Sequence, residues 1–154
     1  MLLDGKRRHD DLLLAIGHHL LVFSLLGVLV AELVMLRPVL NGGEVRRLAR
    51  IDAHYGALAG LVIAVGVARV FFGIKGAEYY THNHWFWAKM AAFVVVGLLS
   101  IAPTVTFIRW RGRLKRDEAY LPAPAEIARV RRLVTVQLAV FTTIPALAAA
   151  MARA

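Results

Sequence analysis

Four long runs of apolar residues alternate with short polar segments along the chain. The runs cover approximately residues 12–36, 51–72, 86–108 and 133–151. A bilayer core of about 30 Å needs about 20 mainly apolar residues in a helix that rises about 1.5 Å per residue. Each run meets that length, and none shows the alternation of a barrel strand. The pattern predicts an all-α, integral membrane four-helix bundle.

Composition supports a single membrane domain over residues 1–154. Hydrophobic residues make up 59% of the 154 residues, which leaves little polar sequence for a separate soluble domain. The first run is too long for the core of a signal peptide, and no small-residue cleavage pattern follows it, so we expect it to stay attached. The chain has no cysteine, so any redox chemistry requires a bound cofactor.

The formal charge of +9 is concentrated in two loops beside the apolar runs. In a soluble protein this charge would suggest nucleic acid, but the positive-inside rule explains it here and no nucleic-acid partner is expected. We predict that both loops face the cytoplasm, that the N and C termini lie outside, and that the chain is a multi-pass protein of the bacterial inner (cytoplasmic) membrane. The basic residues of the two loops are Arg37, Arg46, Arg47 and Arg50, then Arg109, Arg111, Arg113, Lys115, Arg116, Arg129, Arg131 and Arg132.

Turn residues separate the predicted helices. Segment Arg37–Gly43 contains a proline and a Gly-Gly pair that end the first helix, and Glu44–Arg50 is expected to form a basic interfacial turn that meets anionic headgroups. Prolines in Leu121–Glu126 break the third loop before the last helix. Asn83 is a candidate N-cap for the third helix.

Polar residues near the outer ends of the predicted helices form the candidate site. Charged residues inside spans are costly and usually face the bundle interior, although those near an end can instead snorkel to the surface. Adjacent histidines lie about 100° apart around a helix. His18 shares a face with Glu32 and is therefore expected to face the interior in preference to His19. The outer layer contains His18, His19, Arg69 and Lys89, with Tyr79, Tyr80, His82 and His84 in the loop above them.

Histidines near one face of a four-helix membrane bundle favour haem b. Either His18 or His19 could be the metal ligand, since imidazole is a common axial ligand of haem iron. His82 or His84 could supply a second axial ligand. Arg69 and Lys89 could then bind the two propionates, although interhelical hydrogen bonding explains the histidines equally well. Without a Met-rich run or an H-E-x-x-H helix, the case for copper or zinc is weaker.

A second polar layer is expected near the cytoplasmic face. We predict that Asp52 pairs with Arg109 or Arg50 as a structural ion pair that holds helix ends together. A proton path is the alternative, but it would need acids at mid-depth. The layer comprises Glu32, Asp52, His54, Tyr55 and Gln137.

Several of these motifs carry a resemblance to a known family. In their order and spacing they resemble the bacterial predicted membrane proteins grouped as domain of unknown function 2214, over nearly the whole chain. The resemblance implies a membrane protein and no established activity. His54 departs from the apolar residue expected there, so we place no site on it. The motifs are His18–Leu20, Ala31–Val34 with Arg37-Pro38, Arg69–Gly73 with Lys75-Gly76, Phe86–Met90 and Leu98–Ile101.

A more distant similarity concerns the first and third helices. A histidine in the first helix and the Trp87-Ala88-Lys89 start of the third are similar to the HemJ-type protoporphyrinogen oxidases and to the membrane domain of copper-resistance protein D. The HemJ-type enzymes are four-helix haem proteins. This similarity implies an axial role for His18 or His19 and makes Lys89 a site residue.

Three functions are compatible with the sequence. The first is a haem b-binding redox protein that exchanges electrons with a quinone or porphyrin at the outer leaflet. The second is a non-enzymatic accessory or assembly subunit of a larger membrane complex, or a homo-oligomer. The third is copper or other metal handling. No residue is assigned a catalytic role, and whether the chain is an enzyme is left open.

Overall fold

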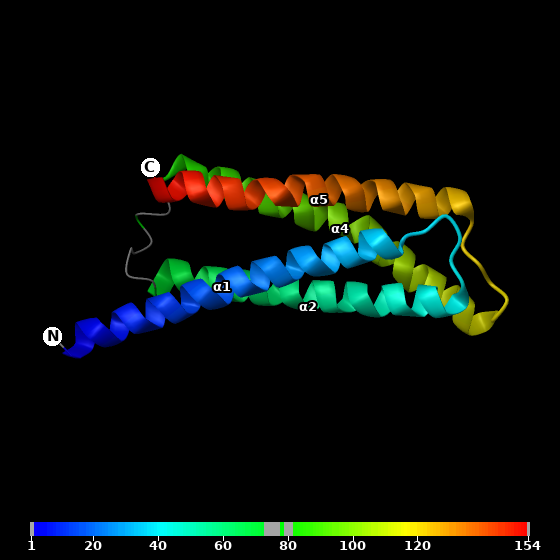
Figure 1. Ribbon diagram of the computed structural model, residues 1–154, viewed down its shortest axis with the longest axis horizontal. Helices are drawn as coiled ribbons and strands as arrows, with labels where there is room; N and C mark the ends of the chain where they lie inside the picture. The colour runs from blue at the N-terminus through cyan, green and yellow to red at the C-terminus, as the bar shows by residue number, and fades with distance from the viewer. Residues whose placement is uncertain (1, 73–77, 79–81, 154) are drawn as a thin grey trace.

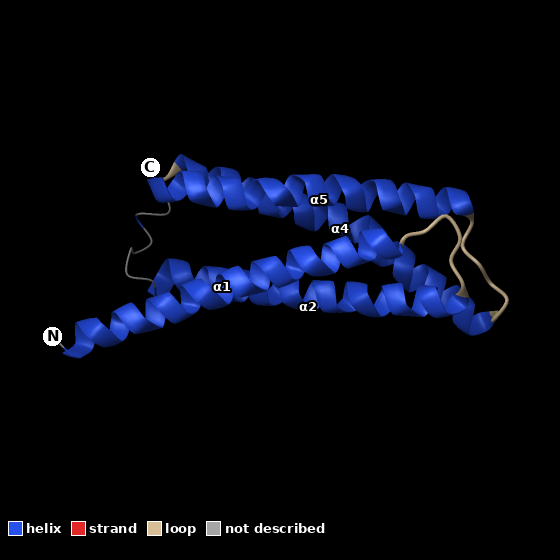
Figure 2. Ribbon diagram, in the orientation of Figure 1, coloured by secondary structure: helices blue, strands red, loops and turns tan. Residues whose placement is uncertain are grey.

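The chain forms an antiparallel bundle of long helices. A computed structural model describes residues 2–72, 78 and 82–153. Within these ranges the helices are α1 (Leu2–Met35), α2 (Gly42–Phe72), α4 (His84–Arg116) and α5 (Pro124–Arg153), and they run alternately up and down (Figure 1). Loops 36–41 and 117–123 connect α1 to α2 and α4 to α5 (Figure 2). The predicted all-α bundle is confirmed.

The helices form a ring in which each packs against two others. The contacts join α1 to α2 and α5, and α4 to the same two helices. Both termini lie at one end of the bundle, which we call the terminal end (Figure 1). The opposite end contains residues 36–41 and 117–123, and we call it the basic end because most of the arginines lie beside it.

The helices are longer than the apolar runs predict. Helix α2 begins at Gly42 and α5 at Pro124, well before the apolar runs that start near residues 51 and 133. Basic residues such as those in Glu44–Arg50 are good helix formers, so the helix continues past the apolar run. Helices of 30 to 34 residues extend about 45–50 Å at about 1.5 Å per residue, beyond the roughly 30 Å bilayer core. Their basic turns therefore reach the headgroup layer.

A reciprocal capping box starts α2. The backbone N–H of Glu44 donates to Oδ1 of Asn41 at 2.9 Å, and the N–H of Asn41 donates to Oε2 of Glu44 at 2.8 Å. Two backbone donors that the helix leaves unpaired are satisfied in this way. At the start of α4 the predicted N-cap is confirmed, because Asn83 accepts a hydrogen bond from the N–H of Trp85 at 2.9 Å.

The outer surface of the bundle is apolar. Large side chains are widely exposed on every helix, including Leu13 at 66%, Phe71 at 70% and Leu98 at 63%. A protein in water rarely exposes apolar surface of this extent, whereas lipid tails accept it. Within the described residues, four segments are long and apolar enough to span a membrane: Leu12–Met35, Gly42–Phe71, His84–Arg116 and Pro124–Met151. The chain is an integral membrane protein in a lipid bilayer.

The buried core lies in the middle and at the basic end. Phe107 and Trp110 of α4 are almost completely buried, with ring centroids 5.8 Å apart. Arg131 of α5 also joins α1 here, since its Nη1 donates to the carbonyl of Leu36 at 3.0 Å. That carbonyl follows the last turn of α1, which contains no basic residue of its own.

Packing becomes looser toward the terminal end. Among the side chains described, none is fully buried in α1 before Leu25 or in α2 after Val62. The same holds in α4 before Val96 and in α5 after Ile144. The helices at the terminal end are therefore less constrained by close packing than those at the basic end.

Candidate functional site

Three helices bring basic side chains together at the terminal end. His18 comes from α1, Arg69 from the last turn of α2 and Lys89 from the second turn of α4. Arg69 and Lys89 both lie near His18, and Arg69 also lies near Lys89. All three side chains are partly buried. We call them the terminal cluster.

His18 and His19 point in different directions. The ring of His18 packs on α2, where a Cβ added at Gly66 would lie 3.4 Å from its Cε1. The ring of His19 is exposed, and its Nδ1–H donates to the carbonyl of Ala15 at 2.7 Å. The prediction that His18 faces the bundle in preference to His19 is confirmed. A Cβ at Gly66 would already be in van der Waals contact with the imidazole.

Two polar atoms of the terminal cluster lack protein partners. In the described structure, Nδ1 of His18 and Nε of Arg69 are buried and form no hydrogen bond. Buried polar atoms are nearly always hydrogen-bonded in folded proteins. The burial of Nε also favours an interior position of Arg69 over snorkelling. The cluster therefore combines positive charge with hydrogen-bonding capacity that the chain itself does not use.

The other predicted ligands lie outside this cluster. The rings of His82 and His84 are exposed, and the Nδ1–H of His82 donates to the carbonyl of Glu78 at 3.0 Å. Tyr79 and Tyr80 fall outside the described residues. A second axial ligand from His82 or His84 stays a prediction.

A second group of polar side chains lies inside the half of the bundle nearer the basic end. Each of α1, α2, α4 and α5 contributes at least one side chain to it. Gln137 of α5 donates from Nε2 to the hydroxyl of Tyr55 at 2.8 Å. Thr104 of α4 donates from Oγ1 to Oδ1 of Asp52 at 2.8 Å. Glu32 of α1 is 2% exposed, and its Oε1 has no hydrogen-bond partner in the described structure. We call these five residues the buried polar cluster.

The predicted ion pair of Asp52 with Arg109 or Arg50 is wrong. Both arginines are exposed, and a hydroxyl rather than a guanidinium meets the carboxylate. Arg50 precedes Asp52 by two residues and so lies about 200° around the helix, where it cannot face the same neighbour. His54 points outward and donates from Nδ1 to the carbonyl of Arg50 at 2.6 Å, so it takes no part in the cluster.

Thr104 is the member of the buried polar cluster that sequence reasoning missed. An uncharged threonine in an apolar run draws no attention, since its hydroxyl commonly bonds to its own helix, as Thr106 does to Ala102 at 2.8 Å. The available signal was its position beside Pro103, which is buried on the side of α4 that faces the other helices.

The comparisons with known proteins identify a family and no activity. The family model of a predicted membrane protein, DUF2214, matches residues 10–154. No curated protein matches the chain, and no solved structure does. The match covers both polar clusters and nearly the whole chain. The chain therefore belongs to the DUF2214 family of predicted membrane proteins.

Proposed function

We propose that this protein binds haem b at the terminal cluster and is redox-active in the membrane. In this proposal His18 is an axial ligand, and Arg69 and Lys89 bind the two propionates. Electrons pass to or from a quinone or a porphyrin in the leaflet at the terminal end. If the predicted topology holds, this is the outer leaflet.

The observation that carries the proposal is that an imidazole and two cationic side chains, each from a different helix, lie together in the terminal cluster. Like charges at this depth in a membrane repel one another and are costly without a counter-ion. Haem b supplies two carboxylates and an iron that accepts a nitrogen ligand. The unpartnered Nδ1 of His18 and Nε of Arg69 are donor or acceptor atoms of the required kinds.

Two further features support the proposal. The bundle is loosely packed at the terminal end, so helices there can adapt to a large flat ligand. Gly66 leaves the imidazole of His18 against α2 without a competing side chain. The similarity of the first and third helices to HemJ-type proteins points in the same direction.

Each side chain has a distinct task in this site. His18 would hold the haem at α1, while Arg69 and Lys89 would bind its two propionates. Their positive charges favour the reduced state of the bound group and so raise its potential. The surrounding apolar side chains exclude water. Haem, when bound, supplies the one-electron chemistry.

An absorption spectrum of the protein purified in mild detergent tests the proposal. We expect a reduced alpha band after dithionite and close to one haem per chain by pyridine haemochrome. His18→Ala removes the band, whereas the matched control His19→Ala keeps it because His19 points away from the bundle. Arg69→Gln and Lys89→Gln keep the band but shift the midpoint potential downward.

Other results would overturn the proposal. A colourless protein from haem-replete cells rejects it, and stable co-purification with a larger complex would then support an accessory or assembly subunit. Stoichiometric copper that depends on histidine would instead indicate metal handling. Across the described ranges, however, no three His, Asp or Glu side chains are grouped as a protein metal site requires.

A further inference from the structure

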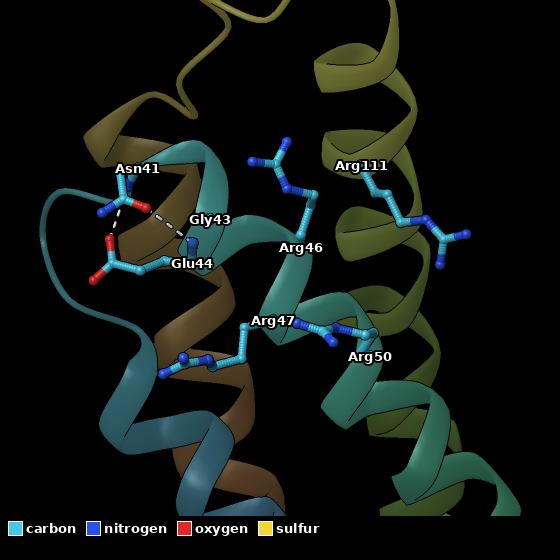
Figure 3. A pocket seen from close by; sticks show the side chains of 7 residues that line it. All are labelled: Asn41, Gly43, Glu44, Arg46, Arg47, Arg50 and Arg111. Atoms are coloured by element: carbon cyan, nitrogen blue, oxygen red, sulfur yellow. Dashed lines mark hydrogen bonds between the residues drawn. The ribbon is translucent and has the colours of Figure 1, made fainter.

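The basic end contains a pocket that is lined by arginines from two helices. It has a volume of about 640 Å³ and lies between the first turns of α2 and the last turns of α4 (Figure 3). We call it the arginine pocket. It is lined by Asn41, Gly43, Glu44, Arg46, Arg47, Arg50 and Arg111.

The positive charge of this pocket is only weakly compensated. Glu44 is the acid in its lining, and the capping box holds its carboxylate on Asn41, away from the arginines (Figure 3). Arg46 and Arg50 lie one turn apart on α2, and Arg111 stands on the neighbouring α4 with its guanidinium directed away from Arg46 (Figure 3). Exposed guanidinium groups in this number are suited to phosphate, which they bind in bidentate fashion.

An apolar groove continues from this pocket between α2 and α4. It has a volume of about 520 Å³, shares Arg111 with the arginine pocket, and we call it the α2–α4 groove. A Cβ at Gly56 or at Gly112 would meet nothing within 4 Å, so the small residues leave real space. The groove is lined by Ala49, Asp52, Ala53, Gly56, Thr104, Ile108, Arg111, Gly112 and Lys115.

The groove has a basic mouth and a mainly apolar floor. Lys115 and Arg111 lie at its basic end, while Ala53, Gly56 and Ile108 lie deeper along the same helices. Asp52 contributes little polar surface, because it is 6% exposed and accepts the hydrogen bond of Thr104.

The depth of the two cavities matches the two parts of a phospholipid. Helix α2 has 31 residues and is about 45 Å long, so its first turns extend beyond the bilayer core of about 30 Å. The arginine pocket therefore lies in the headgroup layer. The α2–α4 groove descends from it into the hydrocarbon.

We propose that one anionic phospholipid of the bilayer binds here as a specific ligand. Its phosphate lies in the arginine pocket, and one acyl chain lies in the α2–α4 groove. A free phosphate would use the arginines alone, whereas the continuous apolar groove requires an amphipathic occupant. Basic pockets beside membrane helices are a recurring way to hold anionic lipid headgroups.

Native mass spectrometry of the detergent-purified protein tests this proposal. Delipidated protein is titrated with phosphatidylglycerol, with phosphatidylcholine of the same acyl chains, and with inorganic phosphate. We expect one phosphatidylglycerol per chain, retained at least about tenfold more strongly than phosphatidylcholine. We expect inorganic phosphate to compete poorly, because it cannot occupy the groove.

Variants distinguish binding of the lipid headgroup from binding of the acyl chain. Arg46→Gln with Arg111→Gln should weaken phosphatidylglycerol binding about tenfold or more. Arg129→Gln with Arg132→Gln is the matched control, because both arginines are exposed on α5 and outside the arginine pocket. Gly56→Leu fills the groove and should weaken lipid binding without changing phosphate binding. Gly97→Leu also enters open space but lies outside the groove, so it should have no effect.

Three results would overturn the proposal. Equal retention of the two lipids would indicate a non-specific lipid annulus. An equal loss of lipid binding in the two double arginine variants would indicate general charge attraction. Strong competition by inorganic phosphate, together with full lipid binding by Gly56→Leu, would show that the arginine pocket binds phosphate and that the α2–α4 groove binds no acyl chain. If Gly56→Leu does not fold, as judged by size-exclusion chromatography, the arginine variants and the competition still decide.

Discussion

The hydroxyl of Thr104 donates a hydrogen bond to Oδ1 of Asp52 at 2.8 Å and so joins α4 to α2 inside the bundle. Asp52 is 6% exposed, so its carboxylate depends on partners within the protein. A buried acceptor that loses its donor bears the cost of its desolvation. This contact is therefore expected to be sensitive to the loss of one hydroxyl.

Replacing Thr104 with valine tests that sensitivity. Thr104→Val keeps the shape and removes the donor, so we expect a loss of about 1–3 kcal/mol in the free energy of unfolding. Thr106→Val is the matched control, since its hydroxyl bonds to the backbone of its own helix, and it should change stability little. Unfolding in mixed micelles measures both. Equal effects of the two variants would contradict the assigned role of Thr104.

The pair Gln137 and Tyr55 allows a double-mutant cycle. Gln137→Leu removes the donor to the buried tyrosine hydroxyl, and Tyr55→Phe removes that hydroxyl. We expect each single change to cost about 1–2 kcal/mol and the double variant to cost less than their sum. Purely additive free energies would show that the two side chains do not interact energetically.

Because only one side of α4 faces the core, the neighbouring residues Phe107 and Ile108 differ sharply in exposure. Phe107 is completely buried and Ile108 is 62% exposed. We expect Phe107→Ala to lower the free energy of unfolding by about 3–5 kcal/mol, because it opens a cavity. Ile108→Ala faces lipid and should cost much less. Thermal denaturation in detergent compares them, and similar losses would place the core elsewhere.

We expect removal of the capping residue to destabilise the protein more at the start of α2, which has a capping box, than at the start of α4. Asn41→Ala removes the acceptor of the Glu44 N–H and frees the Glu44 carboxylate to move, so we expect a loss of about 1–2 kcal/mol. Asn83→Ala removes the bond to the N–H of Trp85 and should cost about 0.5–1 kcal/mol. Chemical denaturation measures both, and a larger loss at Asn83 would contradict this order.

The predicted topology can be measured because the chain has no native cysteine. We expect His9→Cys to react with a membrane-impermeant maleimide added to intact spheroplasts. Ala119→Cys, in the loop at the basic end, should react only in inverted vesicles. Both native side chains are exposed in the structure, so burial does not confound the comparison. The opposite pattern would place both termini in the cytoplasm.

The sequence predicted features that depend on a single helix better than features that depend on two. Apolar length located the spans, and the helix face that His18 shares with Glu32 favoured His18 over His19 for the interior. The partner of Asp52 depends on the rotation and axial offset of α2 against α4. Neither quantity is encoded in a local pattern, so Thr104 was missed and an arginine was expected in its place.

The helix ends show the same division. The capping residue Asn83 follows from local chemistry and was identified. The apolar runs marked the membrane spans and not the helix starts, because apolar length measures the membrane: α2 begins at Gly42 and α5 at Pro124. Arg131 was counted among the loop charges, and only the packed bundle shows that it reaches the carbonyl of Leu36.

That contact between Arg131 and Leu36 bears on how the protein is made. The carbonyl emerges from the ribosome long before the guanidinium that completes its hydrogen bonding, since 95 residues separate the two in the chain. Water or headgroups must satisfy the end of the first helix while the later helices are still being synthesised. Until α5 is inserted, the C-terminal end of α1 therefore lacks this hydrogen-bond donor, and the contact between α1 and α5 that completes the ring of helices is missing.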